Sequence, residues 1–199
     1  MTRPVGIVLA GGASTRFGSD KVSADFEGRP LVQHALERVG EVTDHVVLVL
    51  APDVAVPRLP PALADRIVIA RDPIAHRGPL AGLVAGLDAV GGDSTPVALV
   101  AGADMPRLEP AVLDLLAATV EADPGTGAAM LGADPPATLP IAIAVDLARL
   151  AGNAQLAQDR RSLHAFLDAL HAIVIPAARW RALDPEGLTL HDIDLPSDR

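Results

Sequence analysis

The chain of 199 residues is half hydrophobic and 21% charged, a composition typical of one folded domain with a buried core. We therefore expect a single domain over residues 1–199. Sixteen basic and 25 acidic residues give a formal net charge of −9, which argues against a nucleic-acid partner. The absence of cysteine excludes disulfides, thiolate nucleophiles and cysteine-ligated zinc. The apolar runs are too short for a membrane span and the first residues do not resemble a signal peptide. We expect a soluble cytoplasmic protein with no membrane partner.

Apolar runs alternate with segments of helical periodicity along the chain. The expected strands are residues 5–10, 45–50, 66–70, 97–101, 127–131, 141–145, 173–175 and 188–190. The expected helices are residues 31–39, 80–90, 110–120, 146–150 and 162–170. The proline-rich stretch at 52–61 and the glycine- and proline-rich stretch at 124–136, which encloses the strand expected at 127–131, are expected to be surface loops rather than linkers. This alternation predicts an α/β fold of three layers, with a mostly parallel sheet and helices on both faces. Because ligands bind at the carboxyl ends of strands in such sheets, the loops after Ala10 and Ala101 are the first places to look for a site.

The first of these loops has the parts of a polyphosphate site. Gly11 and Gly12 follow the first strand directly and allow backbone amides to approach a ligand closely, while Arg16 and Lys21 add positive charge. The glycine spacing fits neither the common P-loop nor the dinucleotide-binding fingerprint. Lys21 is also the only lysine among 16 basic residues, which favours a role that arginine cannot fill, although chance is the alternative. The alternative for the loop as a whole is a glycine-rich turn with two solvated cations.

Carboxylates follow several of the other expected strands. Asp104, just beyond the strand at 97–101, is placed to hold Mg²⁺ against phosphates, or it is a helix cap or turn residue. Asp72 and the loop at 78–82 are placed to contact a nucleoside, or they form an ordinary strand-to-helix connection. The alternating acids Asp192 and Asp194 can direct one carboxylate inward as a second metal ligand, or they belong to a solvated tail. The six histidines are scattered and form no convincing metal site.

Taken together, these segments resemble the MobA family of molybdenum cofactor guanylyltransferases, a branch of the nucleotidyltransferases. Residues 9–21 read LAGGASTRFGSDK and match the family pattern L-A-G-G-x-S-x-R-[MF]-G-x-x-K at every fixed position. Residues 28–34 (GRPLVQH), 78–82 (GPLAG) and 104–106 (DMP) are similar to three further family motifs. Residues 192–198 (DIDLPSD) look like a variant of N-I-N-T-P-E-D. The resemblance runs from residue 5 to about residue 198 and is densest before residue 110.

The resemblance implies a Rossmann-like nucleotidyltransferase fold and a Mg²⁺-dependent transfer of GMP from GTP to the phosphate of molybdopterin, with release of pyrophosphate. It implies catalytic roles for Lys21, Arg16 and Asp104, and metal ligation by Asp104, with Asp194 as the candidate second ligand. The nucleotide-binding residues that it implies are Leu9, Ala10, Gly11, Gly12, Lys21, Asp72, Gly78, Pro79, Leu80 and Asp104. The implied substrates are GTP and molybdopterin, and the implied protein partners are molybdoenzyme-maturation proteins.

Three segments depart from the family pattern. Leu50-Ala51-Pro52 stands where the family often carries Asn, aspartates replace the asparagines of the terminal motif, and residues 137–142 lack the usual polar acceptor-side signature. Two alternatives therefore stay open. One is a related nucleotidyltransferase that uses CTP or another phosphorylated acceptor, and the other is a non-catalytic nucleotide-binding regulator. Gly11-Gly12 favours the guanylyl branch, and the presence of Arg16, Lys21 and Asp104 together favours catalysis.

Overall fold

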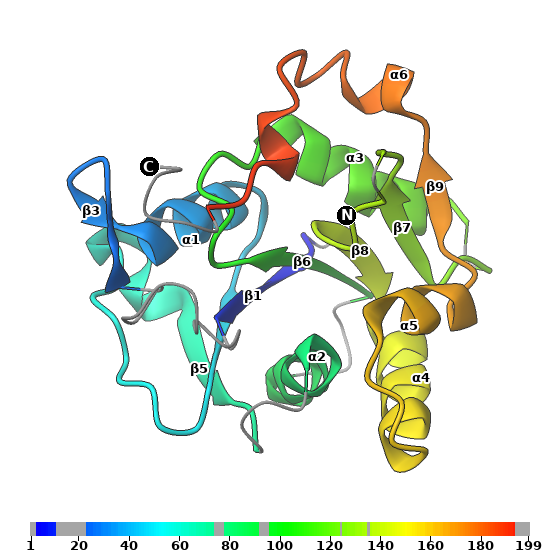
Figure 1. Ribbon diagram of the computed structural model, residues 1–199, viewed down its shortest axis with the longest axis horizontal. Coiled ribbons are helices and arrows are strands. Elements are labelled where there is room, and N and C mark those ends of the chain that lie inside the picture. Colours follow the sequence, from blue (N-terminus) through cyan, green and yellow to red (C-terminus); the bar gives the residue numbers. More distant parts are fainter. Residues whose placement is uncertain are drawn as a thin grey trace.

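A seven-stranded sheet with the order β5-β4-β1-β6-β8-β7-β9 forms the centre of the molecule (Figure 1). The computed structural model describes residues 3–10, 23–73, 78–91, 96–123, 125–134 and 136–193. The strands of the sheet are β1 (Val5–Ala10), β4 (Val46–Leu50), β5 (Ile67–Arg71), β6 (Val97–Gly102), β7 (Ala128–Leu131), β8 (Ile141–Ala144) and β9 (Ile173–Ile175). Within the sheet, β8 runs antiparallel to both of its neighbours, and the other neighbouring strands pair in parallel. The prediction of a mostly parallel sheet is confirmed.

Helices cover both faces of this sheet. Helices α1 (Leu31–Val42) and α3 (Pro110–Glu121) lie on one face, and α2 (Pro79–Ala89), α4 (Val145–Ala157) and α5 (Leu163–Ala169) lie on the other (Figure 1). The side chains of β1 alternate between the two layers, since Val8 packs with α1 and α3 while Ile7 packs with α2 and α5. Burial on both faces explains why β1, β4 and β6 are continuous apolar runs rather than alternating ones. The expected three-layer α/β fold is confirmed.

A small hairpin lies beside this core, at the end of the first loop. Strands β2 (Asp25–Phe26) and β3 (Arg29–Pro30) are joined by Glu27 and Gly28, whose φ angles of 52° and 81° are those of a tight hairpin turn. Phe26 packs with Leu31 and with Ile193 from the far end of the chain in a separate small apolar cluster. The C-terminal segment is therefore fixed next to the start of α1.

Several elements differ from the expected ones, and most of these lie in the last part of the chain, where α4 also extends beyond the helix expected at 146–150. Residues 188–190 were expected to be a strand, but they form the 3-10 helix η3 (Leu188–Leu190). The Asp184 carboxylate accepts hydrogen bonds from the N–H groups of Gly187, Leu188 and Thr189, which favours a helical turn over an extended strand. The short helix α6 (Ala177–Trp180) was not predicted, and neither was the 3-10 helix η2 (Pro61–Arg66).

The loop with Gly11, Gly12, Arg16 and Lys21 lies outside the described residues, and so does Asp194. Over the ranges that are described, no helix combines the length and the apolar character that crossing a bilayer requires.

Candidate functional site

The carboxyl ends of the central strands bring several predicted residues to one edge of the sheet. The Ala103 N–H donates to the Leu9 carbonyl at 2.9 Å, and the Asp72 N–H donates to the Leu50 carbonyl at 2.9 Å. Asp104 follows Ala103 directly. Because β1, β4, β5 and β6 are parallel, Asp72 and Asp104 leave the sheet at the same edge at which the first loop begins.

Asp104 lies in a tight turn directly after β6, and it is half-buried. The turn is closed by the Met105 N–H, which donates to the Gly102 carbonyl at 3.3 Å. A Cβ atom on Gly102 would overlap Oδ1 of Asp104, so this position of the carboxylate requires glycine at residue 102. The Asp104 carbonyl also accepts a hydrogen bond of 2.9 Å from the Ile193 N–H. The backbone thus holds Asp104 from both the strand side and the C-terminal side.

Asp72 lies next to the loop that was predicted to contact a nucleoside. Its side chain is only 5% exposed, and a Cβ atom on Gly82 would lie 3.8 Å from Asp72 Oδ2 and 4.0 Å from Leu9 Cδ2. Gly78 has a φ angle of 87° and is followed by Pro79 at the first position of α2. The structure therefore brings Leu9, Asp72 and the start of α2 together, as a common nucleoside site requires.

Two other predicted nucleotide-binding residues are buried in the core. The side chain of Leu80 is fully buried, and Ala10 is 7% exposed. Their side chains pack inside the protein, so their contribution to a bound nucleotide would come from the backbone.

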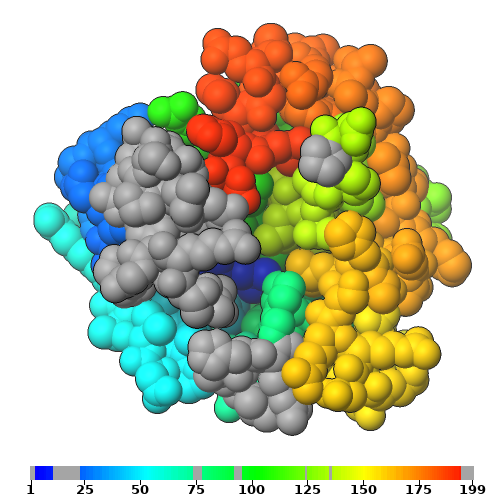
Figure 2. Space-filling model, in the orientation of Figure 1, coloured from blue at the N-terminus to red at the C-terminus, as the bar shows by residue number. Residues whose placement is uncertain are grey.

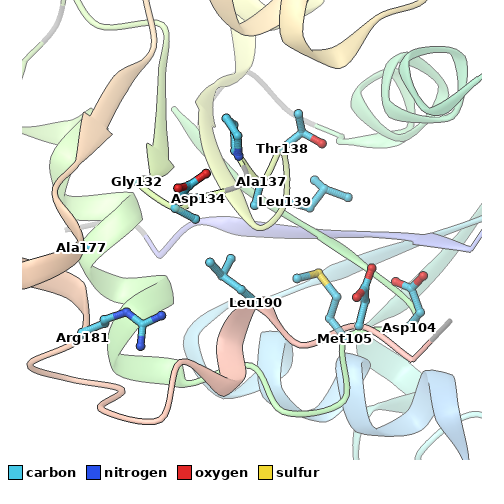
Figure 3. Close-up of a pocket in the computed structure, with 13 residues that line it drawn as sticks. Asp104, Met105, Gly132, Asp134, Ala137, Thr138, Leu139, Ala177, Arg181 and Leu190 are labelled. Atoms are coloured by element: carbon cyan, nitrogen blue, oxygen red, sulfur yellow. The ribbon is translucent and has the colours of Figure 1, made fainter. Parts of the chain in front are cut away.

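A cavity of about 720 Å³ opens beside Asp104. In Figure 2 the surface is hollowed between the C-terminal segment, in red, and the yellow-green segment before β8. The close-up in Figure 3 shows Asp104, Met105 and Leu190 on one side of this cavity and Asp134 and Thr138 on the other. Its volume lies within the range of pockets for small molecules, which is roughly 300–1,000 Å³.

Arg181 lines the same cavity and was not predicted from the sequence. Its Cζ atom lies 4.9 Å from the centre of the Trp180 ring, an arrangement that allows a cation–π interaction. Trp180 is fully buried, and its Nε1–H donates to the Gly132 carbonyl at 3.0 Å. No motif surrounds this arginine in the sequence, and a contact between neighbouring residues gives no periodic signal.

The donor set at this edge suits a hard cation. Asp104 and Asp192 line the same cavity, and carboxylate oxygens are the protein ligands that Mg²⁺ prefers. Among the residues that the structure describes, no three His, Cys, Asp or Glu side chains gather closely enough to hold a metal by themselves. The alternation of acids at 192–194 was the signal for a second carboxylate, and the described member of the pair, Asp192, reaches the cavity.

Asp184 stabilises the segment next to the cavity and has a shifted pKa. Burial raises the pKa of its carboxyl group, but hydrogen bonds from Thr189, Leu188 and Gly187 lower it, and the net pKa lies below the ordinary value. The carboxylate form is therefore the form that holds η3 in place.

Comparisons with known proteins cover most of the chain. A family model described as the MobA-like NTP transferase domain matches residues 6–173. A relative from Chloroflexus aggregans, named "Probable molybdenum cofactor guanylyltransferase", is 32% identical over an alignment of 200 residues that covers 97% of this chain and 90% of the relative. A relative of the same name from Natronomonas pharaonis is 41% identical over 118 residues, which are 58% of this chain and only 56% of the relative.

A solved structure shares the fold. The crystal structure of molybdopterin-guanine dinucleotide biosynthesis protein A from Archaeoglobus fulgidus matches with a TM-score of 0.75 at 24% sequence identity. The match covers 98% of this chain and 94% of that one. The same architecture is thus present over nearly the whole length of both chains.

Proposed function

Because the chain belongs to the MobA-like NTP transferase family and is a nucleotidyltransferase of the MobA type, we propose that it transfers GMP from GTP to the phosphate of molybdopterin. The products are molybdopterin guanine dinucleotide and pyrophosphate, and the reaction depends on Mg²⁺. We further propose that the whole chain acts as one domain and that it hands its product to molybdoenzyme-maturation proteins.

The position of Asp104 carries this proposal. Asp104 lies at the sheet edge from which the first loop starts, and it also lines a cavity large enough for a second substrate. A nucleotide bound over the first loop and an acceptor in the cavity would therefore meet at this carboxylate. Both reacting groups are anionic, so their approach requires positive charge between them.

In the proposed reaction an oxygen of the molybdopterin phosphate attacks the α-phosphorus of GTP, and the bond between the α-phosphorus and the bridging oxygen breaks. Gly11 and Gly12 would donate backbone N–H groups to the phosphates, and Arg16 and Lys21 would neutralise charge on the α-phosphate and on the departing pyrophosphate. Asp72 and residues 78–80 would hold the nucleoside. Asp104, together with Asp192 or Asp194, would hold Mg²⁺, which supplies positive charge to the phosphate oxygens when it is bound.

No protein nucleophile is needed in this scheme, because the acceptor phosphate attacks directly. Catalysis then depends on alignment of the two substrates and on charge stabilisation, which are the main requirements of phosphoryl-type transfer. The chain contains no cysteine, which is compatible with a reaction that needs no protein nucleophile.

One observation favours a second candidate, a transferase that uses CTP. The terminal motif carries Asp192 and Asp194 where the guanylyl pattern has asparagines. A change from amide to carboxylate removes hydrogen-bond donors and adds negative charge next to the site. The choice of nucleotide is therefore part of the test.

The test is a turnover assay with purified full-length protein, molybdenum-loaded molybdopterin and Mg²⁺, with GTP, CTP, ATP or UTP as the donor. We expect the dinucleotide, identified by mass spectrometry, and equimolar pyrophosphate with GTP. Formation of the cytosine dinucleotide instead would establish the CTP candidate. Nucleotide binding without any pyrophosphate release would identify a non-catalytic regulator and contradict the proposal.

A further inference from the structure

We propose that Arg181 binds the end of the acceptor that is remote from its reacting phosphate, by donating hydrogen bonds to oxygen atoms at that end. This inference rests on the proposed function, since it takes molybdopterin as the acceptor and places its phosphate at Asp104. It concerns a residue that lies outside all of the family motifs in the sequence.

The location of Arg181 within the cavity supports an acceptor contact rather than a nucleotide contact. Of the described residues predicted to hold the nucleotide, only Asp104 lines this cavity. In Figure 3, Arg181 and Asp104 lie at opposite sides of the view, with Leu190 and Met105 between them. A molecule whose phosphate reaches Asp104 therefore extends towards Arg181 with its other end.

Arg181 is an exposed residue whose guanidinium group lies between two surfaces. One surface is the ring of Trp180, 4.9 Å from Cζ, and the other is the backbone of Gly187. Gly187 has a φ angle of 73°, and a Cβ atom at this residue would lie 3.1 Å from Nη1 and 3.2 Å from Nη2 of Arg181. An arginine that is already oriented loses less side-chain freedom when a ligand binds, which strengthens binding.

The charge of the cavity favours a ligand contact at this arginine. Three carboxylates line the cavity, those of Asp104, Asp134 and Asp192, and Arg181 is the one basic side chain among the described lining residues. Within the described part of the chain, Arg181 contacts the Trp180 ring but forms no salt bridge or hydrogen bond. Its planar fork of N–H donors is therefore available, and such a fork matches oxygen acceptors on a ligand.

Molybdopterin offers two sources of such oxygens. One is the carbonyl edge of the pterin, and the other is the set of oxygen atoms on the molybdenum that the acceptor carries as cargo. Both present acceptor atoms that a guanidinium recognises in the same way. Metal-free and molybdenum-loaded molybdopterin distinguish the two sources, because only the loaded form has the second set.

Trp180 provides a direct readout of binding. The chain contains one tryptophan and no tyrosine, so intrinsic fluorescence reports on the ring that lies against Arg181. We would titrate the full-length protein with each form of molybdopterin, without nucleotide, and follow Trp180 emission. The variants are Arg181→Gln and Arg181→Lys. Arg179→Gln is the matched control, because Arg179 lies on α6 two residues before Arg181, is exposed and does not line the cavity.

We expect Arg181→Gln to raise the acceptor Kd by about tenfold or more, Arg181→Lys to raise it less, and Arg179→Gln to leave it unchanged. An effect with both forms of molybdopterin assigns the contact to the pterin, and an effect with the loaded form alone assigns it to the molybdenum-bound oxygens. In steady-state assays the acceptor KM should rise by a similar factor while the KM for GTP and kcat stay unchanged. Gly187→Ala gives a second variant that keeps the arginine but displaces it, and it should raise the acceptor Kd as well.

The contrary outcomes separate this inference from the proposed function. If the wild-type protein produces the dinucleotide and Arg181→Gln binds the acceptor within about twofold of wild type, the role of Arg181 is wrong and the proposed function stands. If the wild-type protein neither binds molybdopterin nor turns it over with any nucleotide, both proposals are wrong. Should Arg181→Gln fail to fold, Arg181→Lys and Gly187→Ala decide between these outcomes.

Discussion

The position of the Asp104 carboxylate depends on a residue two places before it. Gly102 has no side chain, and the carboxylate occupies the space that a Cβ atom would need. The Asp104 backbone is fixed a second time by the Ile193 N–H, which donates a hydrogen bond to the Asp104 carbonyl. The position of the Asp104 carboxylate therefore depends both on its own turn and on the C-terminal segment.

Asp104→Asn should reduce turnover by about 100-fold or more, because an amide binds Mg²⁺ much more weakly than a carboxylate does and leaves phosphate charge unneutralised. The thermal midpoint should change little, since Asp104 is half-buried and lies at a loop. The assay is pyrophosphate release at saturating Mg²⁺, and Asp114→Asn, at an exposed position of α3, is the control. Activity near the wild-type rate in Asp104→Asn would rule out its metal role.

The lowered pKa of Asp184 predicts how the stability of the folded protein depends on pH. Its pKa is lower in the folded protein than in the unfolded chain, so its stabilising contribution is complete above the unfolded value of about 3.9 and is lost as the pH falls through the folded value. Asp184→Asn should lower the free energy of unfolding by roughly 2 kcal/mol at neutral pH, because hydrogen bonds to a buried charge are lost.

The measurement is chemical denaturation of wild type and Asp184→Asn from neutral pH down to acid pH. The difference between the two proteins should shrink below about pH 4. A difference that stays constant over this range would show that the charge of Asp184 does not stabilise η3.

At the level of secondary-structure elements, α2 connects the core to the nucleoside side of the site. Its first turn follows Gly78 and lies next to Asp72, while its middle packs closely on the sheet. The closest approach is at Gly86, where a Cβ atom would lie 2.8 Å from Ile7 Cγ2 and 3.0 Å from Val49 Cγ2. These branched side chains are buried in β1 and β4 and have little room to move.

Gly86→Ala should therefore destabilise the protein by roughly 1 kcal/mol, since overpacking outweighs the gain in helix propensity. Gly91→Ala is the matched control, because Gly91 is exposed just beyond α2 and a Cβ atom there meets nothing within 4 Å. Urea denaturation of both variants measures the effect. Equal stabilities of the two variants would mean that α2 moves away from the sheet without cost.

At the level of the whole molecule, the cavity is closed by segments far apart in the sequence. Ile193 is fully buried with Phe26 and Leu31, and this contact holds the C-terminal segment beside the end of β6. The net charge of −9 repels nucleotides and phosphorylated acceptors in general. Binding then depends on positive charge close to the site, and we expect Arg16, Lys21 and Arg181 to supply it.

A thermal-shift panel with GTP, CTP, ATP and UTP, each with and without Mg²⁺, tests this dependence. A nucleotide at about 100 times its Kd should stabilise the folded protein by roughly 2.7 kcal/mol. We expect the shift with Mg²⁺ and GTP and expect it to disappear in Lys21→Ala. A GTP shift that survives in Lys21→Ala would exclude this lysine from the phosphate site.

Hydrophobic patterning alone determined the layers of this protein. The apolar runs of β1 and β6 and the periodicity of α1 and α3 predicted a mostly parallel sheet between two helical layers, because burial on both faces leaves a continuous pattern in the strands. Fold class then predicted where Asp72 and Asp104 emerge, since parallel strands end at one edge. The strands, the helices and the positions of these two aspartates can be predicted from local sequence, because each depends on a single segment.

The remaining features depend on contacts that the sequence pattern does not show. Leu188, Thr189 and Leu190 fit a strand or a helical turn equally well by pattern, and the hydrogen bonds of Asp184 select the turn. No pattern in the sequence marks Arg181. Its orientation depends on the Trp180 ring on one side and on the absence of a side chain at Gly187 on the other. A pattern of residues encodes which side chains are buried, but the direction of an exposed side chain is set by contacts between segments that the pattern does not connect.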